Sequence, residues 1–336
     1  MYITIPDAYM ARDGENVLVK VDDEIKFRVP IHNLEGIVCF GYAGASPGLI
    51  NLCCERGVVL SFLTEHGRFM GRISGGVTGN ILLRKSQYRW TENEQISMRL
   101  AKRFISAKIV NSRAVLHRTI RDHPETANTG LLSSLIEKLA DIHPALQAAS
   151  NADEIRGIEG HAANLYFSGF NELILTHKDE FTMTDRNRRP PLDRINAMLS
   201  FLYTLLAHEV VAALESIGLD PQAGFFHRDR PGRPSLALDL MEEMRPHFVD
   251  RLVATMINRG QVLPNGFDFR ENGAVLMNEE TRKTILVTWQ KRKQEEIIHP
   301  YLEEKVSMGL VPYIQAMLLA RHIRGDLEDY PPFYWK

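Results

Sequence analysis

The sequence predicts an α+β protein in which a small N-terminal β domain, residues 1–90, precedes a larger, mostly α-helical domain, residues 91–336. Short segments rich in β-branched and aromatic residues, separated by turn residues, fill the first part. After about Trp90 the apolar residues recur at helical spacing instead. A chain of 336 residues is long enough for two domains with separate cores.

The N-terminal part reads as strands around one helix. The expected strands are residues 17–21, 26–29, 36–40, 58–63 and 79–83, and the expected helix is residues 47–56. The change of pattern places the domain boundary between Ser86 and Asn93. We expect this first domain to serve self-association, because it carries no cluster of acids suited to chemistry.

The remaining chain reads as helices interrupted by one hairpin. The expected helices are residues 92–121, 131–139, 153–170, 192–217, 235–258, 280–298 and 312–323. Asn272-Gly273 is a hairpin turn signal between two short apolar runs, Phe267–Phe269 and Ala274–Met277.

A histidine stands ahead of an acidic helix. His227 precedes a segment rich in proline and arginine, and Ser235 then follows a proline as an expected N-cap. Asp239, Glu242 and Glu243 share one face of that helix. Crowded carboxylates repel one another unless a positive charge compensates, and a divalent cation with His227 as a further ligand is one solution. A solvated acidic face beside a capped loop is the alternative.

A further carboxylate lies on the apolar stripe of another predicted helix. Ile155, Ala162 and Ala163 stand four before, three after and four after Glu159. A carboxylate on a packed face is costly unless it is paired, protonated or bound to a metal. The alternative to a metal is an ion pair with Arg156 or another arginine.

Several motifs follow one another along nearly the whole chain, in the segments Leu52–Gly71, Ala107–Arg113, Ile158–Tyr166, Arg188–Tyr203 and Phe226–Glu242. Together they resemble the CRISPR-associated adaptation integrases, the Cas1 family. The tail, Leu319–Asp326 with Tyr330-Pro-Pro-Phe333, resembles the version that accompanies type I-C systems.

This resemblance implies an enzyme that inserts captured DNA fragments, or spacers, into a repeat array by attack of a 3′-hydroxyl on a phosphodiester. Glu159, His227 and Glu242 would bind Mg²⁺ or Mn²⁺, which would act as a Lewis acid on the scissile phosphate. Asp239 would complete the catalytic set, as a support for a ligand or as an alternative ligand. Family members often carry aspartate where Glu242 stands, so either Glu242 or Glu243 could be the ligand.

DNA contacts must come from local basic groups, because the formal net charge is only -2. Arginines beside a metal site suit phosphate oxygens, although each basic group alone could be a solvated face. The residues expected to contact DNA are Arg84, Arg99, Lys102, Arg103, Lys108, Arg113, Arg188, Arg189, Arg228, Arg230 and Arg233.

Three polar residues, Asn196, Ser200 and Tyr203, form a stripe along one apolar helix. From the resemblance we expect this helix near the active site, where the stripe could orient phosphate or buttress the ligands. Ordinary hydrogen bonding within the core is the alternative.

The resemblance also implies double-stranded DNA, a homodimer and the family's small CRISPR-associated partner protein as partners. Three cysteines without a CxxC motif favour a reducing compartment, and no long apolar run or signal peptide is evident. We therefore expect a cytoplasmic protein without membrane contact. The rival functions are a structure-specific nuclease that cuts branched DNA without integration, a catalytically inactive DNA-binding scaffold and, least favoured, a small-molecule metallohydrolase.

Overall fold

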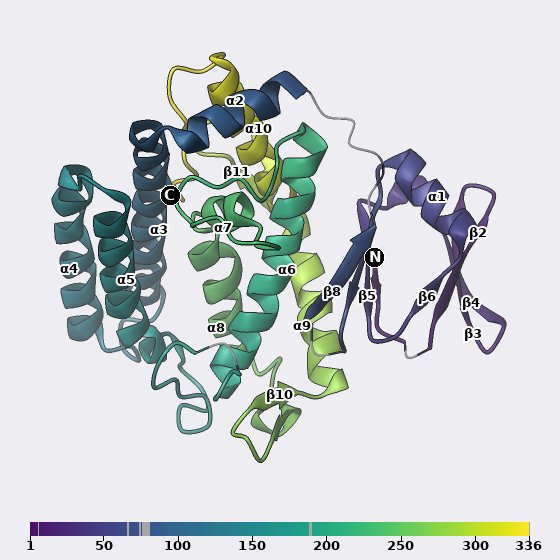
Figure 1. Cartoon of the computed structure of the whole chain (residues 1–336). Helices are drawn as coiled ribbons and strands as arrows, with labels where there is room; N and C mark the ends of the chain where they lie inside the picture. The colour runs from purple at the N-terminus through teal and green to yellow at the C-terminus, as the bar shows by residue number, and fades with distance from the viewer. Residues whose placement is uncertain (6, 66, 74, 76–80, 188–189, 336) are drawn as a thin grey trace. The chain divides into compact units, whose positions relative to one another are not determined.

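The computed structural model describes residues 1–5, 7–65, 67–73, 75, 81–187 and 190–335. The chain divides into two compact units, Met1–Gly79 and Asn80–Lys336. The first unit is rich in strands and the second is mostly helical, which confirms the α+β prediction (Figure 1).

Two four-stranded sheets build the first unit. One sheet has the order β4 (Glu24–Pro30), β3 (Asn16–Val21), β2 (Tyr9–Asp13) and β6 (Gly44–Ala45), with only the β2–β6 pair parallel. The other has the order β1 (Tyr2–Ile3), β5 (Gly36–Phe40), β7 (Val59–Leu63) and β8 (Phe69–Ile73), with only the β7–β8 pair antiparallel. The helix α1 (Pro47–Arg56) contacts a strand of each sheet, and Leu49 and Leu52 join the apolar core of this unit.

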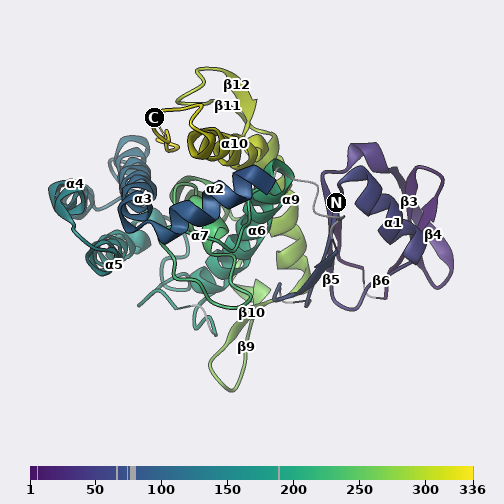
Figure 2. The ribbon, with the colours of Figure 1, turned by 45° about the horizontal axis from the view of Figure 1, so that its top comes forward.

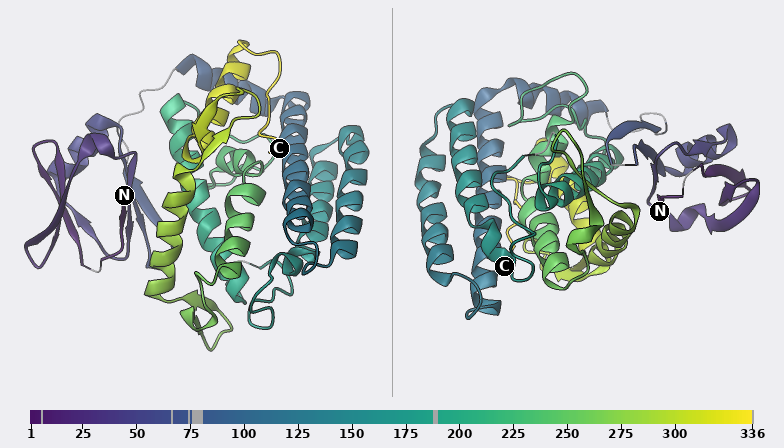
Figure 3. Two further views of the ribbon diagram at one scale, coloured as in Figure 1. Left: turned by 180° about the vertical axis from the view of Figure 1, so that it is seen from behind. Right: turned by 90° about the horizontal axis from the view of Figure 1, so that it is seen from below.

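The second unit begins with a layer of long helices. These are α3 (Glu94–Asp122), α4 (Thr129–Ala148) and α5 (Ala152–Ser168), which pack against one another in pairs and lie side by side in both views of Figure 3. The central helices are α6 (Arg194–Ile217), α7 (Ser235–Met241), α8 (Arg251–Asn258), α9 (Glu279–Gln294) and α10 (Val311–Arg324). Two hairpins complete the unit, β9 (Phe267–Phe269) with β10 (Val275–Met277) and β11 (Glu296–Ile298) with β12 (Lys305–Ser307).

Helix starts follow the sequence closely, because asparagine or aspartate side chains cap them. In each case the side chain accepts a hydrogen bond from the backbone N–H three residues later. The residues that do so in the second unit are Asn93, Asn128, Asn151, Asp193 and Asn278. The predicted Ser235 cap is wrong: Pro234 holds the cap position, and the Ser235 hydroxyl donates to the Arg228 carbonyl oxygen at 3.2 Å instead.

The predicted strand at residues 79–83 is wrong where the structure describes it, because α2 (Ile81–Glu92) is a helix. This helix packs on α3 and α10 of the second unit. Its buried Gln87 donates to the backbone carbonyls of Asp220 and Ala223, at 2.8 and 2.9 Å. The boundary between the two units along the chain therefore lies about ten residues before the boundary predicted near Trp90.

The helix predicted over residues 235–258 is broken in the middle. α7 ends at Met241, and a π-helical turn, η3 (Pro246–Asp250), precedes α8. Pro246 has no backbone N–H to continue the α-helical ladder, which accounts for the break. The helix predicted over residues 280–298 likewise ends at Gln294, and β11 follows it.

The helix α6 is apolar over most of its length. Within the described part of the chain it is the one helix that is long and apolar enough to cross a membrane, judged by length and composition. The sequence analysis did not expect such a long apolar segment. However, 61% of that window is buried inside the protein, and α6 packs against α7 and α10. These contacts are those of a core helix.

The segment after α10 is built into the helical unit rather than lying free. The Glu243 carboxylate accepts hydrogen bonds from Tyr330 Oη at 2.8 Å, Gln315 Nε2 at 2.9 Å and the Phe333 backbone N–H at 2.8 Å. Asn111 of α3 bonds to the Phe333 carbonyl, at 2.7 Å. The segment thus lies between α3 and α10 (Figure 2).

Phe333→Ala should lower the free energy of unfolding by about 3–5 kcal/mol, because a fully buried ring leaves a cavity when it is removed. Urea denaturation followed by far-UV circular dichroism measures this loss. Tyr334→Ala, which truncates a partly exposed ring, is the matched control and should cost clearly less. Equal losses for the two variants would contradict an anchored tail.

Candidate active site

The loop before α7 is organised by one buried acid, Asp239. Its Oδ2 accepts from the backbone N–H groups of Phe225 and Phe226, at 2.6 and 2.9 Å. Its Oδ1 accepts from the His227 backbone N–H at 2.8 Å and lies 2.6 Å from Nδ1 of the imidazole. The other ring nitrogen, Nε2, is directed toward Glu242, 3.9 Å from its Oε1. Carboxylates orient metal-binding imidazoles in this way.

A lysine from α3 joins the two predicted acidic ligands. The Lys108 ammonium pairs with Oε1 of Glu159, on α5, and lies 2.8 Å from Oε2 of Glu242. Arg245 contacts the other oxygen of Glu242 at 2.7 Å. Lys108 was predicted to contact DNA but is only 8% exposed, so its charge serves the acids.

The electrostatics favour the ionised forms of Glu242 and Lys108. Burial alone would raise the pKa of Glu242, but Arg245, Lys108 and His227 outweigh it and lower that pKa to about 2. Burial would lower the pKa of Lys108, but the carboxylates of Glu242 and Glu159 raise it overall. At neutral pH both acids of the pair therefore face a charged ammonium.

One oxygen of this cluster is left without a hydrogen bond. Among the described residues, Oε2 of Glu242 is buried and has no hydrogen-bond partner, although the Lys108 ammonium lies 2.8 Å away as an ion pair. A buried acceptor in this state is unfavourable and suits a cation. As the side chains stand, no group of three or more His, Cys, Asp or Glu residues in the described ranges converges closely enough to hold a metal.

Glu243 is turned away from this cluster. It holds the C-terminal segment, and burial raises its pKa to about 8 despite the hydrogen bonds from Phe333, Tyr330 and Gln315. Because its oxygens are engaged by the C-terminal segment, Glu243 is not placed to bind a metal with His227. Of the two adjacent acids, Glu242 is the one that faces the imidazole.

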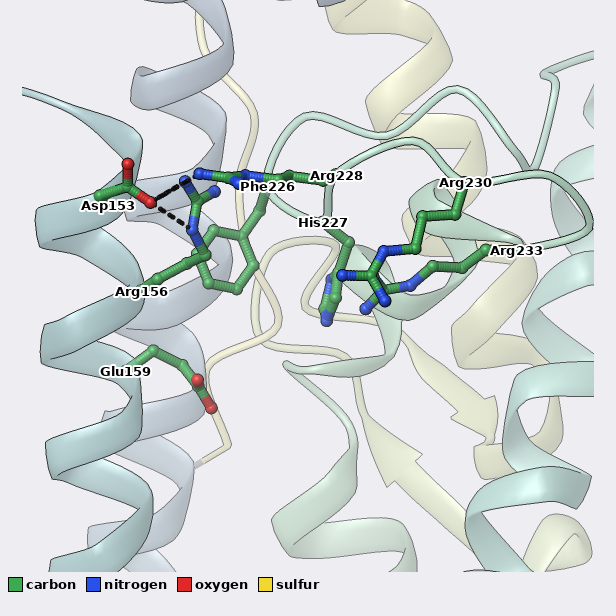
Figure 4. A pocket seen from close by; sticks show the side chains of 8 residues that line it. All are labelled: Asp153, Arg156, Glu159, Phe226, His227, Arg228, Arg230 and Arg233. Atoms are coloured by element: carbon green, nitrogen blue, oxygen red, sulfur yellow. Dashed lines mark hydrogen bonds and ion pairs between the residues drawn. The ribbon is translucent and has the colours of Figure 1, made fainter.

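A cavity of 380 Å³ opens beside Glu159 and His227 (Figure 4). Asp153 and Phe226 also line this cavity. Its walls are strongly basic, because they include four arginines, Arg156, Arg228, Arg230 and Arg233. Asp153 Oδ1 accepts from Arg228 Nη2 at 2.8 Å and from Arg156 Nε at 3.1 Å. In Figure 4 the Arg230 and Arg233 side chains run alongside each other toward the His227 ring.

The other basic residues predicted to contact DNA are not gathered at this cavity. Arg84, Lys102 and Arg113 donate to backbone carbonyls of Gly218, Gln147 and Ile136, and Arg103 pairs with Asp329. Arg99 is exposed on α3, and Arg188 and Arg189 lie outside the described residues. The sequence analysis thus named three of the four arginines of the cavity and treated Arg156 only as an ion-pair partner.

The polar stripe of α6 supports cations near the acids. Asn196 accepts from Arg186 Nη1 at 2.6 Å, and Ser200 Oγ lies 3.5 Å from the same guanidinium. The ring of Tyr203 faces the guanidinium of Arg186 at 5.3 Å and that of Arg245 at 5.2 Å. Of the three residues of the stripe, Tyr203 is the one that contacts the arginine paired with Glu242.

The sequence analysis did not identify Lys108 and Arg245 as members of this cluster. Arg245 stands one turn after Glu242, so its i,i+3 spacing was a usable signal. Lys108 gave no comparable signal, because it stands 51 residues from Glu159.

The fold and the site together define a two-unit protein with an acid–histidine cluster beside a basic cavity, which suits phosphate-bearing substrates. Residues 1–291 match the family model described as CRISPR associated protein Cas1. The chain belongs to this family.

Relatives and solved structures agree with this assignment. The chain is 50% identical over 336 residues to CRISPR-associated endonuclease Cas1 1 of Chlorobaculum tepidum, covering 100% of this chain and 98% of the relative. It is 48% identical over 340 residues to CRISPR-associated endonuclease Cas1 2 of Rhodospirillum rubrum, with the same coverage. A Cas1 protein from Thermotoga maritima has a similar fold, with a TM-score of 0.81 at 22% identity over 96% of each chain. A casposase bound to integration product has a TM-score of 0.85 at 23% identity, over 100% of this chain and 94% of that one.

Asp239→Asn should lower the free energy of unfolding by about 1–3 kcal/mol for each donor that it leaves without an acceptor. The amide nitrogen would face N–H groups that now meet a carboxylate oxygen, and the His227 loop would loosen. Chemical denaturation measures the loss. Asp229→Asn, an exposed acid of the same loop, is the control and should change stability by about 0.5 kcal/mol or less. Matching curves for both variants would refute the role given to Asp239.

Proposed function

We propose that this chain is a metal-dependent DNA endonuclease and integrase of CRISPR adaptation, which inserts captured DNA fragments into a repeat array. The observation that supports it is that Glu159 and Glu242 share the Lys108 ammonium, with His227 Nε2 3.9 Å from Glu242, beside a cavity lined by arginines. Relatives named CRISPR-associated endonucleases and the fold shared with a casposase bound to integration product support the proposal.

Glu159, His227 through Nε2 and Glu242 would hold the metal, and the buried Oε2 of Glu242 that lacks a hydrogen bond supports this assignment. Two carboxylates and one imidazole suit Mn²⁺ and Mg²⁺. When bound, the ion would supply Lewis-acid polarisation of the scissile phosphate.

The remaining steps are tasks of the chain's own residues. Asp239 keeps Nδ1 of His227 engaged, so that Nε2 faces the reacting centre. The arginines of the cavity hold phosphate oxygens of the DNA and position the strand. A 3′-hydroxyl of the fragment loses its proton and attacks phosphorus, one P–O bond forms, and one breaks to release the 3′-oxygen of the cut strand, which takes up a proton, so that no net proton is consumed. Because one phosphodiester replaces another, no covalent protein intermediate is needed.

We further propose double-stranded DNA, a second copy of this chain and the small protein Cas2 as partners, with the first unit, Met1–Gly79, serving dimerisation. A similar fold in a Cas6-RT-Cas1–Cas2 complex, at a TM-score of 0.83, supports the Cas2 partnership. We assign the type I-C-like version from the tail motifs and the cytoplasm as the location. In this assignment the helical unit carries the chemistry, since all of the acids discussed lie there.

Glu159→Gln and His227→Ala should each reduce joining of a 3′-hydroxyl fragment to a repeat-bearing plasmid by about a hundredfold or more, since each removes a ligand. Gel assays with purified Cas2 and Mn²⁺ measure joining, and fluorescence anisotropy should show DNA binding within about threefold of the wild type. The control is His161→Ala, which changes an exposed histidine on α5, the helix that carries Glu159.

Two outcomes would favour rival functions. Cleavage of branched DNA without joining to a supplied 3′-hydroxyl would indicate a structure-specific nuclease. DNA binding without metal binding or cleavage would indicate an inactive scaffold. Joining at the wild-type rate by His227→Ala would show that the proposed mechanism is wrong.

Asp153→Asn should raise DNA affinity by about twofold to fivefold at low salt, the amount by which an exposed ion pair typically matters. The carboxylate now occupies Arg156 and Arg228 as a phosphate oxygen would, and its loss frees both for DNA. Anisotropy titrations over a salt series should also show a steeper salt dependence. Glu154→Gln is the matched control, because this neighbouring acid bonds to Ser150 and Asn151 rather than to an arginine. An Asp153→Asn affinity equal to the control's would exclude this competition.

A further inference from the structure

Lys108 occupies an unusual position for a lysine. Its side chain is 11% exposed, and its ammonium lies between the carboxylates of Glu159 and Glu242, which come from different elements. A buried ammonium is costly unless nearby anions compensate its charge. Both neighbouring acids do so here, and they are the acids assigned to the metal.

The two acids already have partner cations without a metal. Lys108 and Arg245 face the carboxylates of Glu159 and Glu242, and the Asp239 carboxylate adds a further negative charge beside His227. A divalent cation bound to Glu159 and Glu242 would lie close to both resident cations. Like charges at such short range repel, so metal binding is favoured when one resident cation moves away.

The contacts indicate which cation gives way. Arg245 is fixed between Oε1 of Glu242, at 2.7 Å, and the face of the Tyr203 ring, at 5.2 Å. Lys108 is a flexible chain with a compact charge, and it stands beside Oε2 of Glu242, the buried oxygen for which the described residues offer no hydrogen bond. Lys108 therefore competes for the oxygen that the metal would take.

We propose that Lys108 is the resident counter-ion of the metal site, which stabilises the metal-free protein and weakens divalent-metal binding by competing for Glu159 and Glu242. This inference rests on the proposed metal site and adds a residue that sets its affinity. Lys108 is a positioning residue, because it acts through the two acids.

Lys108→Met in the full chain removes the charge and keeps most of the apolar stem. Without metal, its melting temperature should fall below that of the wild type, because two carboxylates lose their shared counter-ion. Mn²⁺ affinity measured by calorimetry should rise by about tenfold or more, and Mn²⁺ should raise the melting temperature of the variant more than that of the wild type. Neither measurement needs DNA or turnover.

Two controls isolate the charge. Lys138→Met removes an exposed lysine of α4 and should change neither Mn²⁺ affinity nor the metal-free melting temperature. Lys108→Arg keeps a positive charge and should keep the weaker Mn²⁺ binding of the wild type. If Lys108→Met does not fold, Lys108→Gln, which retains a donor for Glu159, should show the same increase in affinity.

The outcomes separate this inference from the proposed function. If the wild type binds Mn²⁺ and the neutral Lys108 variants bind it no more tightly, the competition is refuted and the metal site stands. If neither the wild type nor the variants bind Mn²⁺, the metal site itself is refuted, and this inference with it. If Lys108→Met and Lys108→Gln bind Mn²⁺ more tightly than the wild type and Lys108→Arg does not, the competition is supported.

Discussion

The helical unit depends on three carboxylates that are buried on or just after one short helix. Asp239, Glu242 and Glu243 are each at most 1% exposed, and a carboxylate removed from water needs donors or cations. The three acids find them in three directions: in the His227 loop, in the Lys108–Arg245 pair and in the C-terminal segment. Segments distant in sequence are thereby fixed around α7.

The three acids lie where the helix is interrupted. On a continuous α-helix Asp239 would lie near both Glu242 and Glu243, whereas the two adjacent acids would already point in different directions. Instead α7 ends at Met241 and the π-helical turn begins at Pro246. The two adjacent acids lie in the turn between these elements, so that Glu242 faces the imidazole and Glu243 faces the tail. Local departures from α-helical geometry of this kind are frequent at functional sites.

The distribution of charge fits a protein that handles phosphate without being basic as a whole. The net charge is -2, yet four arginines wall one cavity. Some of these cations are already compensated by acids of the chain, as Asp153 shows with Arg156 and Arg228. Such internal ion pairs hold arginines in position before a substrate arrives, and a phosphate can then exchange with the carboxylate.

Much of the fold and part of the candidate site followed from local sequence pattern. Helix α1 and strand β5 have the predicted bounds, and the hairpin turns at Gly273 with a φ of 79°, because these features depend on nearby residues alone. Glu159 stood out as a carboxylate on a packed helix face, and His227, Asp239 and Glu242 stood out by their spacing. The family resemblance then assigned these residues to one site.

Tertiary packing decided the rest. Helix α2 was mistaken in part for a strand because its anchor, Gln87, bonds to residues 133 and 136 positions away. Lys108 looked like one more cation of a basic helix until α5 and the turn after α7 brought two acids to it. The periodicity of a sequence reflects the backbone geometry of one segment, whereas the partner of a buried charge depends on which distant segments pack beside it.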